Sequence, residues 1–204
     1  MARKKDPARE AERREQMMAT CYRLLATRSH HAMTLEAVAK ELGGSKGQIA
    51  HYYPTKEALI SATMRGALEL YGQLLLAVAT EEAPLRTRLK HLIAAALPDA
   101  ELLRERIAFV AEVWSFAKTS PETREAVRAA HAGVYEVTRK LLDLGIEEGF
   151  VTAKNARALL LPISAMFDGL AVHAAHSDLD VEELRRHAEK TLELLLGLGG
   201  KSRV

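Results

Sequence analysis

Apolar residues recur every three or four positions in most segments of the chain, which is the spacing of one face of an α-helix. The first of these segments begins at Pro7, a residue favoured in the first turn of a helix, and ends near Arg28. Its apolar positions are Met17, Met18, Cys21, Leu24 and Leu25. The pattern therefore predicts a first helix over residues 7–28.

A short second helix is predicted over residues 35–42. Its apolar face consists of Leu35, Val38, Ala39 and Leu42. Thr34 precedes it and has the hydroxyl with which an N-cap accepts a backbone N–H. Gly43 and Gly44 follow it, and glycine commonly ends helices. The segment therefore has helix-end signals on both sides.

A third helix, also short, is predicted from Lys46 to about Tyr52. Ser45 is its N-cap, and Gln48 three residues later completes a capping box. Pro54 ends it, because proline lacks the N–H that a continuing helix requires. Two short helices joined by a glycine turn, with a longer helix before them, form a helix-turn-helix unit.

Longer helices are predicted for the rest of the chain. Thr55 caps an uninterrupted helical pattern over residues 56–80. Later breaks fall at Pro84, Pro98, Pro121, Gly149 and residues 177–180. They delimit five more helices and bring the expected total to about nine. Because the chain has only 6 Pro and 12 Gly among 204 residues, we expect an all-α fold.

The composition indicates a soluble globular protein, with 48% hydrophobic and 27% charged residues. The longest run without a charged residue, 70–80, is too short for a membrane-spanning helix. The first ten residues lack the apolar segment of a secretory signal. Cys21 is the only cysteine, which excludes an intramolecular disulfide, and its place on an apolar stripe predicts a buried thiol. We therefore expect a cytoplasmic protein with no membrane partner.

The net charge of +2 is distributed unevenly along the chain. Residues 1–60 carry 11 Lys and Arg against 7 Asp and Glu, whereas residues 61–204 carry 18 against 20. Lysine and arginine neutralise phosphates, so a basic N-terminal segment suits a nucleic-acid partner. This evidence is weak by itself, since charged segments are more often solvated helix faces.

The outer face of the third predicted helix has residue types that read DNA. Ile49 and Tyr53 are expected to face the core. The outward positions are Lys46, Gly47, Gln48, His51 and Tyr52. Glutamine can pair bidentately with adenine in the major groove, so Gln48 is the predicted base reader. Each of these residues alone is equally suited to a cap or a solvated face, and it is their combination that favours DNA.

The sequence TLEAVAKELGGSKGQIAHYYPTKEALI, residues 34–60, resembles the N-terminal domain of the TetR family of bacterial repressors. The shared pattern is a capped helix, a short turn, Ser-Lys-Gly, His-Tyr, and a helix that begins with Lys-Glu-x-Leu. Residues 8–60 fit this pattern without a gap. Gly-Gln-Ile-Ala-His-Tyr-Tyr and the later Asp168-Gly169-Leu170 resemble the BetI-like branch in particular.

This resemblance implies which residues contact DNA and how the chain is organised. The implied DNA-contacting residues are Thr34, Ser45, Lys46, Gly47, Gln48, His51, Tyr52 and Lys56. One departure is Ala50, because many family members have a tyrosine there that contacts phosphate. The resemblance also implies a dimer, with a helix-turn-helix domain over residues 1–60 and an effector-binding and dimerisation domain over residues 61–204.

Aromatic and polar residues lie together on the helix faces of the second domain, a mixture typical of small-molecule pockets. The predicted effector-binding residues are Phe109, Glu112, Trp114, Phe116, His131, Tyr135, Phe167 and Asp168. For any one of them an ordinary role in the core is the commoner alternative.

The two C-terminal helices, over residues 159–176 and 181–198, are expected to form the dimer interface. The candidate positions for this surface are Ile163, Met166, Leu170, Ala174, Leu184, Ala188, Leu192 and Leu195. Such stripes are more often core, so only part of these positions is assigned to the dimer. His173 and His176 lie near Asp178, but a histidine pair without a defined third ligand is usually surface, so no metal is expected.

The sequence thus predicts a ligand-responsive transcriptional regulator that represses from a near-palindromic operator as a dimer and is released by a small-molecule effector. The alternative is a helical small-molecule-binding or adaptor protein that keeps this fold without binding DNA. No catalytic motif is present, so we expect neither an enzyme nor a cofactor.

Overall fold

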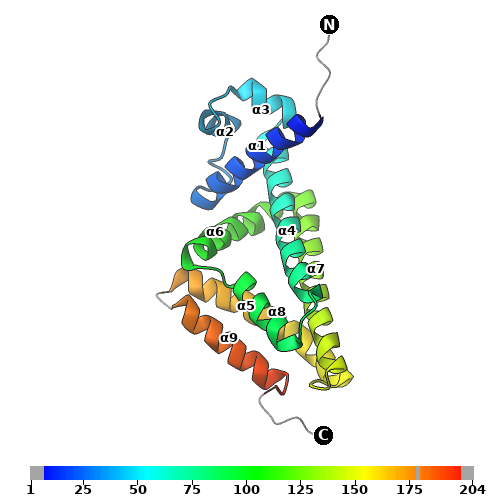
Figure 1. Cartoon of the computed structure of the whole chain (residues 1–204). Coiled ribbons are helices and arrows are strands. Elements are labelled where there is room, and N and C mark those ends of the chain that lie inside the picture. The colour runs from blue at the N-terminus through cyan, green and yellow to red at the C-terminus, as the bar shows by residue number, and fades with distance from the viewer. Residues whose placement is uncertain (1–6, 178–179, 199–204) are drawn as a thin grey trace. The chain divides into compact units, whose positions relative to one another are not determined.

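The computed structural model describes residues 7–177 and 180–198, and within them it contains nine α-helices and no strand (Figure 1). The helices are α1 (Pro7–Thr27), α2 (Leu35–Glu41), α3 (Lys46–Tyr52), α4 (Lys56–Thr80), α5 (Leu85–Ala96), α6 (Ala100–Ala117), α7 (Pro121–Glu147), α8 (Ala153–His176) and α9 (Val181–Leu195). The predicted all-α fold is confirmed for this part of the chain. The helix bounds are close to those predicted, except that α8 begins at Ala153 rather than Leu159 and α9 ends at Leu195 rather than Leu198.

The described residues form two compact units. The N-terminal unit contains residues up to 68 together with 108–127, and the C-terminal unit contains 69–107 together with 128–198. The residues described of the predicted DNA-binding domain, 7–60, all belong to the N-terminal unit. That unit also takes in parts of α4, α6 and α7, which a single boundary at residue 60 would assign to the second domain.

The core of the N-terminal unit is built on the predicted apolar stripe of α1. Cys21 and Leu25 of this stripe are almost completely buried, at 0% and 1% exposure. They pack in one cluster with Met17, Leu24, Met33, Leu35, Val38, Ala39, Ile49, Tyr53, Leu59, Ile60, Met64, Phe109, Val113 and Phe116. Helices α1 to α4 therefore share one core with the second half of α6.

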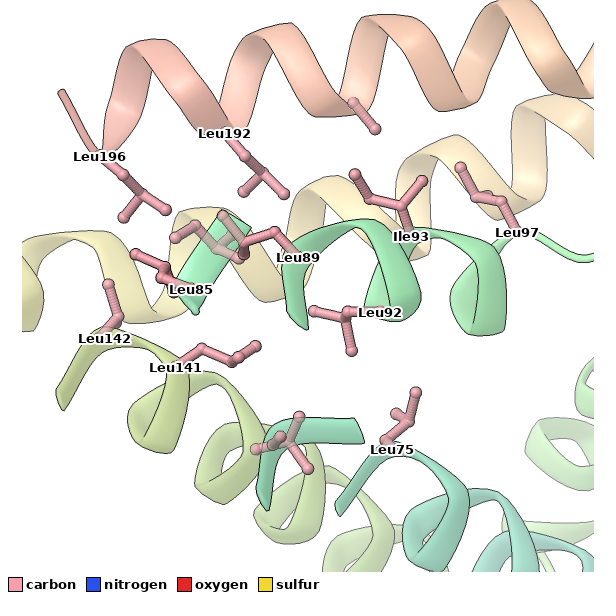
Figure 2. Packing of buried hydrophobic residues seen from close by; sticks show 14 of the residues in the cluster. Leu75, Leu85, Leu89, Leu92, Ile93, Leu97, Leu141, Leu142, Leu192 and Leu196 are labelled. Atoms are coloured by element: carbon pink, nitrogen blue, oxygen red, sulfur yellow. The ribbon is translucent and has the colours of Figure 1, made fainter. Parts of the chain in front are cut away.

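The core of the C-terminal unit is rich in leucine and is centred on α5. Figure 2 shows Leu85, Leu89, Leu92, Ile93 and Leu97 among side chains from the surrounding helices. These neighbours are Leu75 of α4, Leu141 and Leu142 of α7, and Leu192 and Leu196 at the end of the chain's last helix. Burial of this apolar surface, at about 25 cal/mol per Å², is the main contribution to the stability of such a core.

Five of the eight candidate positions for the dimer surface on α8 and α9 are core residues of the chain itself, and this excludes them from that surface. Ile163 and Ala174 of α8 are only 4% and 1% exposed, and both belong to the C-terminal unit's own core. On α9, Leu184, Ala188 and Leu192 are buried in the same cluster. These residues face inward because α9 packs against α5 and α8 within one chain.

α8 is the one helix among the described residues that is long and apolar enough to cross a membrane, by length and composition alone. A core helix of a soluble protein passes the same test. Ile163 and Ala171 of α8 are buried in the C-terminal unit, whereas Leu161 and Val172 are exposed. The apolar character of α8 is therefore explained only in part by packing within this chain.

Candidate nucleic-acid interface

The turn between α2 and α3 has glycine at two positions for different reasons. Gly43 has φ +65°, in the left-handed region that glycine adopts without strain. At Gly44 a Cβ would lie 2.5 Å from the Oε1 atom of Gln48, so a larger residue there would displace the end of that side chain from its cap. The two glycines thus set the angle between the helices and leave room for the side chain that caps α3.

The capping box predicted at the start of α3 is confirmed. The backbone N–H of Gln48 donates to Ser45 Oγ at 3.4 Å, and the backbone N–H of Ser45 donates to Gln48 Oε1 at 2.9 Å. Bidentate pairing with adenine needs the amide oxygen of glutamine as acceptor and its NH₂ group as donor. In this structure the oxygen of Gln48 already accepts the N–H of Ser45, so adenine must use the second lone pair of that oxygen or displace the cap.

The outer face of α3 is polar and accessible. Lys46, Gln48 and His51 are exposed, whereas Ile49 and Tyr53 are 2% and 7% exposed and pack in the core, as predicted. A Cβ on the neighbouring exposed glycine at position 47 would meet only Ser45 Oγ, at 3.9 Å. The backbone here can therefore be approached closely from outside.

Two further predicted contact residues lie at helix ends, Thr34 at the start of α2 and Tyr52 at the end of α3. Thr34 caps α2, its Oγ1 accepting the backbone N–H of Ala37 at 3.1 Å. Tyr52 is partly buried at the end of α3, and its ring centroid lies 5.2 Å from that of His51, edge to face. Both hydroxyl groups belong to the same helix-turn-helix as the outward residues of α3.

Both predicted phosphate-binding lysines have a partner within the chain. Lys46 Nζ lies 2.7 Å from a carboxylate oxygen of Glu36 on α2, and both side chains are more than half exposed. The hydrogen bond from Lys46 is the main cause that lowers the pKa of Glu36. Lys56 Nζ donates to the carbonyl oxygen of His31 at 3.3 Å. A phosphate at either lysine must compete with these contacts.

Arg14 of α1 is a residue that the sequence reasoning missed. Its Nη1 atom donates to the carbonyl oxygen of Tyr52, and its Nη2 atom pairs with Glu10. A signal was present, because Arg14 lies three residues before Met17 on the buried stripe of α1. A charged residue on the extension of an apolar stripe suggests a specific partner.

Four of the predicted effector residues belong to the N-terminal unit, and two of these are core residues. Phe109 is 2% exposed, with its ring centroid 4.3 Å from that of Tyr22, and Phe116 is 7% exposed. Trp114 is 49% exposed. The two phenylalanines therefore fill the helix-turn-helix core, which corrects the expectation that they line a pocket.

Glu112, the fourth of these residues, is bound to His30 in the segment between α1 and α2. One carboxylate oxygen, Oε2, lies 2.7 Å from both the backbone nitrogen and the ring Nδ1 of His30. His30 is buried at 6% exposure, and its ring packs edge-on to Phe116 at 5.3 Å. Burial alone would raise the pKa of Glu112, but the hydrogen bonds from His30 outweigh it and lower this pKa. Glu112 thus holds His30 in place within the fold and does not line an open pocket.

The other four predicted effector residues belong to the C-terminal unit. His131 and Tyr135 of α7 are exposed, and on α8 Phe167 is partly buried and Asp168 exposed. Desolvation nevertheless raises the pKa of Asp168, and the nearby His131 opposes this shift. Burial also raises the pKa of Tyr71 on α4, with a smaller contribution from Asp168. The structure thus places Tyr71 near Asp168, one residue of the predicted set.

Arg106 of α6 lies beside Tyr71 in the C-terminal unit. Its guanidinium carbon is 4.9 Å from the centroid of the Tyr71 ring. Its Nη1 atom donates to the carbonyl oxygen of Ala95 at 3.1 Å, and its Nη2 atom donates to that of Ala96. Because these are the last carbonyls of α5, Arg106 caps that helix while its guanidinium lies over the ring of Tyr71.

No other reactive centre is found in the described part of the chain. It contains no group of three or more His, Cys, Asp or Glu able to hold a metal ion, and Asp178 of the considered histidine cluster lies outside it. Cys21 is buried as predicted, and burial raises the pKa of its thiol to about 11.

Residues 18–63 match the bacterial regulatory proteins of the tetR family, and residues 84–197 match the C-terminal domain of BetI-type transcriptional repressors. The chain is 30% identical over 171 residues to the regulator BetI of Brucella anthropi, covering 81% of this chain and 84% of that protein. It is 25% identical over 167 residues to the regulator PksA of Bacillus subtilis, covering 80% and 78%.

A solved structure shares the fold over nearly the whole chain. It is a transcriptional regulator from Saccharomonospora viridis in complex with choline, which superimposes with a TM-score of 0.79 at 26% identity. The match covers 90% of this chain and 96% of that protein.

Proposed function

The chain belongs to the TetR family and is a ligand-responsive DNA-binding transcriptional regulator rather than an enzyme, and we propose that it represses from a near-palindromic operator as a dimer. The observation that carries this proposal is the outer face of α3, a capped helix with exposed polar side chains and an open glycine. A helix of this kind presents its N-terminal residues to base edges in the major groove.

The roles within the interface follow from the chemistry of each group. Gln48 is the base reader. The phosphate and backbone contacts are assigned to Thr34, Ser45, Lys46, Gly47, His51, Tyr52 and Lys56. Hydroxyls, backbone N–H groups and ammonium groups hold phosphates and fix the register, whereas sequence is read by side chains at base edges. Ala50 has no polar group, so no phosphate contact is assigned to it.

Dimerisation through α8 and α9 is supported by the apolar side chains that these helices leave uncovered. Leu161 and Val172 of α8 are 59% and 39% exposed, and they lie eleven residues apart on one helix face. Leu194 and Leu195 at the end of α9 are 80% and 39% exposed. A two-fold pairing of these surfaces would remove the exposed leucines from water. Binding in successive major grooves requires the two α3 helices of such a dimer to lie about 34 to 36 Å apart.

The test of this function is selection of bound sequences from random double-stranded DNA with the purified full chain. A palindromic consensus with half-sites about one helical turn apart is expected for a two-fold dimer. Sedimentation of Leu161→Glu and Leu194→Glu variants checks the interface, and Leu70→Glu, an exposed leucine of α4, is the control. Selection that returns no consensus, or a dimer that survives both substitutions, contradicts the proposal.

For the effector we propose an organic cation of the choline type. The choline complex of the regulator from Saccharomonospora viridis supports this class. Asp168 adds a carboxylate with no hydrogen bond or ion pair to the described residues, and Tyr71 and Phe167 add aromatic rings nearby on α4 and α8. Carboxylates and aromatic faces together are the groups that attract quaternary ammonium ions.

Calorimetric titration with choline tests the effector class. Asp168→Asn should weaken binding, whereas Glu147→Gln, which neutralises an exposed carboxylate of α7, should not. By linkage, a saturating operator must weaken choline binding by the same factor by which choline weakens operator binding, commonly about 5- to 150-fold. Equal choline affinity with and without operator would show that choline is not the effector.

A further inference from the structure

We propose that Arg14 of α1 is a positioning residue that fixes how the recognition helix α3 presents its side chains to DNA. Its Nη1 atom donates to the carbonyl oxygen of Tyr52 at 3.2 Å, across 38 residues of sequence. This inference goes beyond the proposed function, because neither the sequence pattern nor the resemblance assigns a role to Arg14. It concerns the orientation of α3 rather than a contact with DNA.

The C-terminal end of α3 needs such a donor. α3 has only seven residues, and the last carbonyls of any helix have no N–H partner within it. Pro54 follows two residues after the end of α3 and supplies no N–H. Arg14 provides both a hydrogen bond and a positive charge where the helix dipole is negative. It therefore compensates for the abrupt end of the helix.

Arg14 also holds α3 through aromatic contacts. Its guanidinium carbon lies 5.3 Å from the ring centroid of Tyr52 and 5.5 Å from that of Tyr53. Glu10, one turn earlier on α1, pairs with the other side of the guanidinium at 3.2 Å. Because Tyr53 is anchored in the core at 7% exposure, these contacts restrain rotation of α3 about its own axis. Gln48 lies one turn before Tyr52, so the same restraint sets its direction.

A direct phosphate contact by Arg14 would also weaken DNA binding when it is lost, but it leaves a different signature. Each phosphate neutralised contributes about 0.9 to the slope of log K against log salt. A positioning residue leaves this slope unchanged and instead lowers the preference for the selected operator over unrelated DNA. The salt dependence therefore separates the two roles.

The experiment compares Arg14→Ala, Arg14→Lys and Arg14→Met in the full-length dimer. We expect Arg14→Ala to weaken binding to the selected operator about tenfold, with an unchanged salt slope and nearly unchanged binding to unrelated DNA. Arg14→Lys keeps the charge but not the planar stacking group, so it should remain weaker than wild type. Arg13→Ala removes the same charge from an exposed neighbour and is the matched control.

A second readout needs no DNA. Amide hydrogen exchange in the free protein should accelerate in α3 for Arg14→Ala and Arg14→Met, and should stay at the wild-type rate in α2. If Arg14→Ala does not fold, operator binding and hydrogen exchange in α3 are measured on Arg14→Lys instead. The proposal is overturned by a slope that falls by about 0.9, by full rescue with lysine, or by wild-type exchange in α3. Loss of all sequence preference by the wild-type chain would instead contradict the operator model.

Discussion

Each unit has an apolar core of its own, and the two units differ in the element that their directional bonds hold in place. In the N-terminal unit, directional bonds join residues far apart in sequence around the helix-turn-helix, as Arg14 bonds to Tyr52 and His30 to Glu112. In the C-terminal unit they hold the end of α5, where Arg106 donates to the carbonyl of Ala95 and Arg185 to that of Leu97. The ion pairs that join α5 to α9, such as Lys90 with Glu189, lie at the surface. Surface ion pairs of this kind contribute little to stability.

This difference is consistent with what each unit has to do. A helix that reads base edges must be held at a defined angle, and hydrogen bonds and ring contacts are sensitive to angle. Apolar packing is non-directional and depends mainly on the area buried. In the C-terminal unit the leucine core supplies the burial, and the bonds of Arg106 and Arg185 fix the end of α5 rather than a helix that meets DNA.

The largest expected effect is on the leucine core. Leu92→Ala should lower the free energy of unfolding of the protein by about 2–5 kcal/mol, because the side chain is 4% exposed and its removal leaves a cavity. Chemical denaturation measures the change. Leu70→Ala, at 69% exposure on α4, is the control and should have little effect. Equal losses for the two variants would contradict the importance of packing around α5.

The His30 contact should contribute less than the leucine core and should depend on pH. Glu112→Gln is expected to lower the free energy of unfolding by about 1–3 kcal/mol at neutral pH, because it removes the charge that two donors share. Since folding lowers the pKa of Glu112, this stability is present above the ordinary glutamate pKa and is lost as the pH falls through the lower folded value.

Denaturation curves between pH 7 and pH 3 test this pH dependence. The difference between wild type and Glu112→Gln should shrink toward the acid end. Glu15→Gln, on the exposed face of α1, provides the control. A difference that stays constant over this range would mean that the carboxylate charge of Glu112 does not stabilise the fold.

Gln48→Glu separates the cap from the reading of bases. Glutamate preserves the capping box with Ser45 but has no NH₂ group to donate to adenine. Discrimination should fall by about 1–3 kcal/mol at one or two base positions while the stability of the protein is kept. Repeating the selection from random DNA measures this change, and an unchanged consensus would show that Gln48 is not the base reader.

Lys56→Ala should act on all DNA sequences alike. Loss of one phosphate contact flattens the salt slope by about 0.9, and the consensus should stay the same. Binding at several salt concentrations measures the slope. Lys40→Ala, an exposed lysine in the last turn of α2, is the comparison variant. A slope that matches wild type for Lys56→Ala would remove Lys56 from the interface.

The smallest expected effect concerns Cys21. The thiol is fully buried with its pKa raised to about 11, so little thiolate forms at neutral pH. Native protein should therefore react with a thiol reagent far more slowly than denatured protein. Rapid labelling of the native state would indicate that the N-terminal core opens readily and exposes Cys21.

The sequence alone determined the features that depend on residues close to one another along the chain, namely helix ends, caps and turns. The capping box at Ser45, the end of α2 before Gly43 and the inward direction of Ile49 are set within a few residues of each other, and all were predicted. The number of helices followed in the same way from proline and glycine breaks. Periodicity and end signals are local properties, so they can be read before the fold is known.

Only the tertiary structure decided which partner each apolar or charged side chain meets. Periodicity predicted that Phe109 and Ile163 lie on apolar faces, but not that each belongs to the core of its own unit. Likewise Glu112 was expected near an effector, and it meets His30, 82 residues away in sequence. A helix face has the same pattern whether it covers a core, a ligand or a second subunit, because each of these removes apolar surface from water.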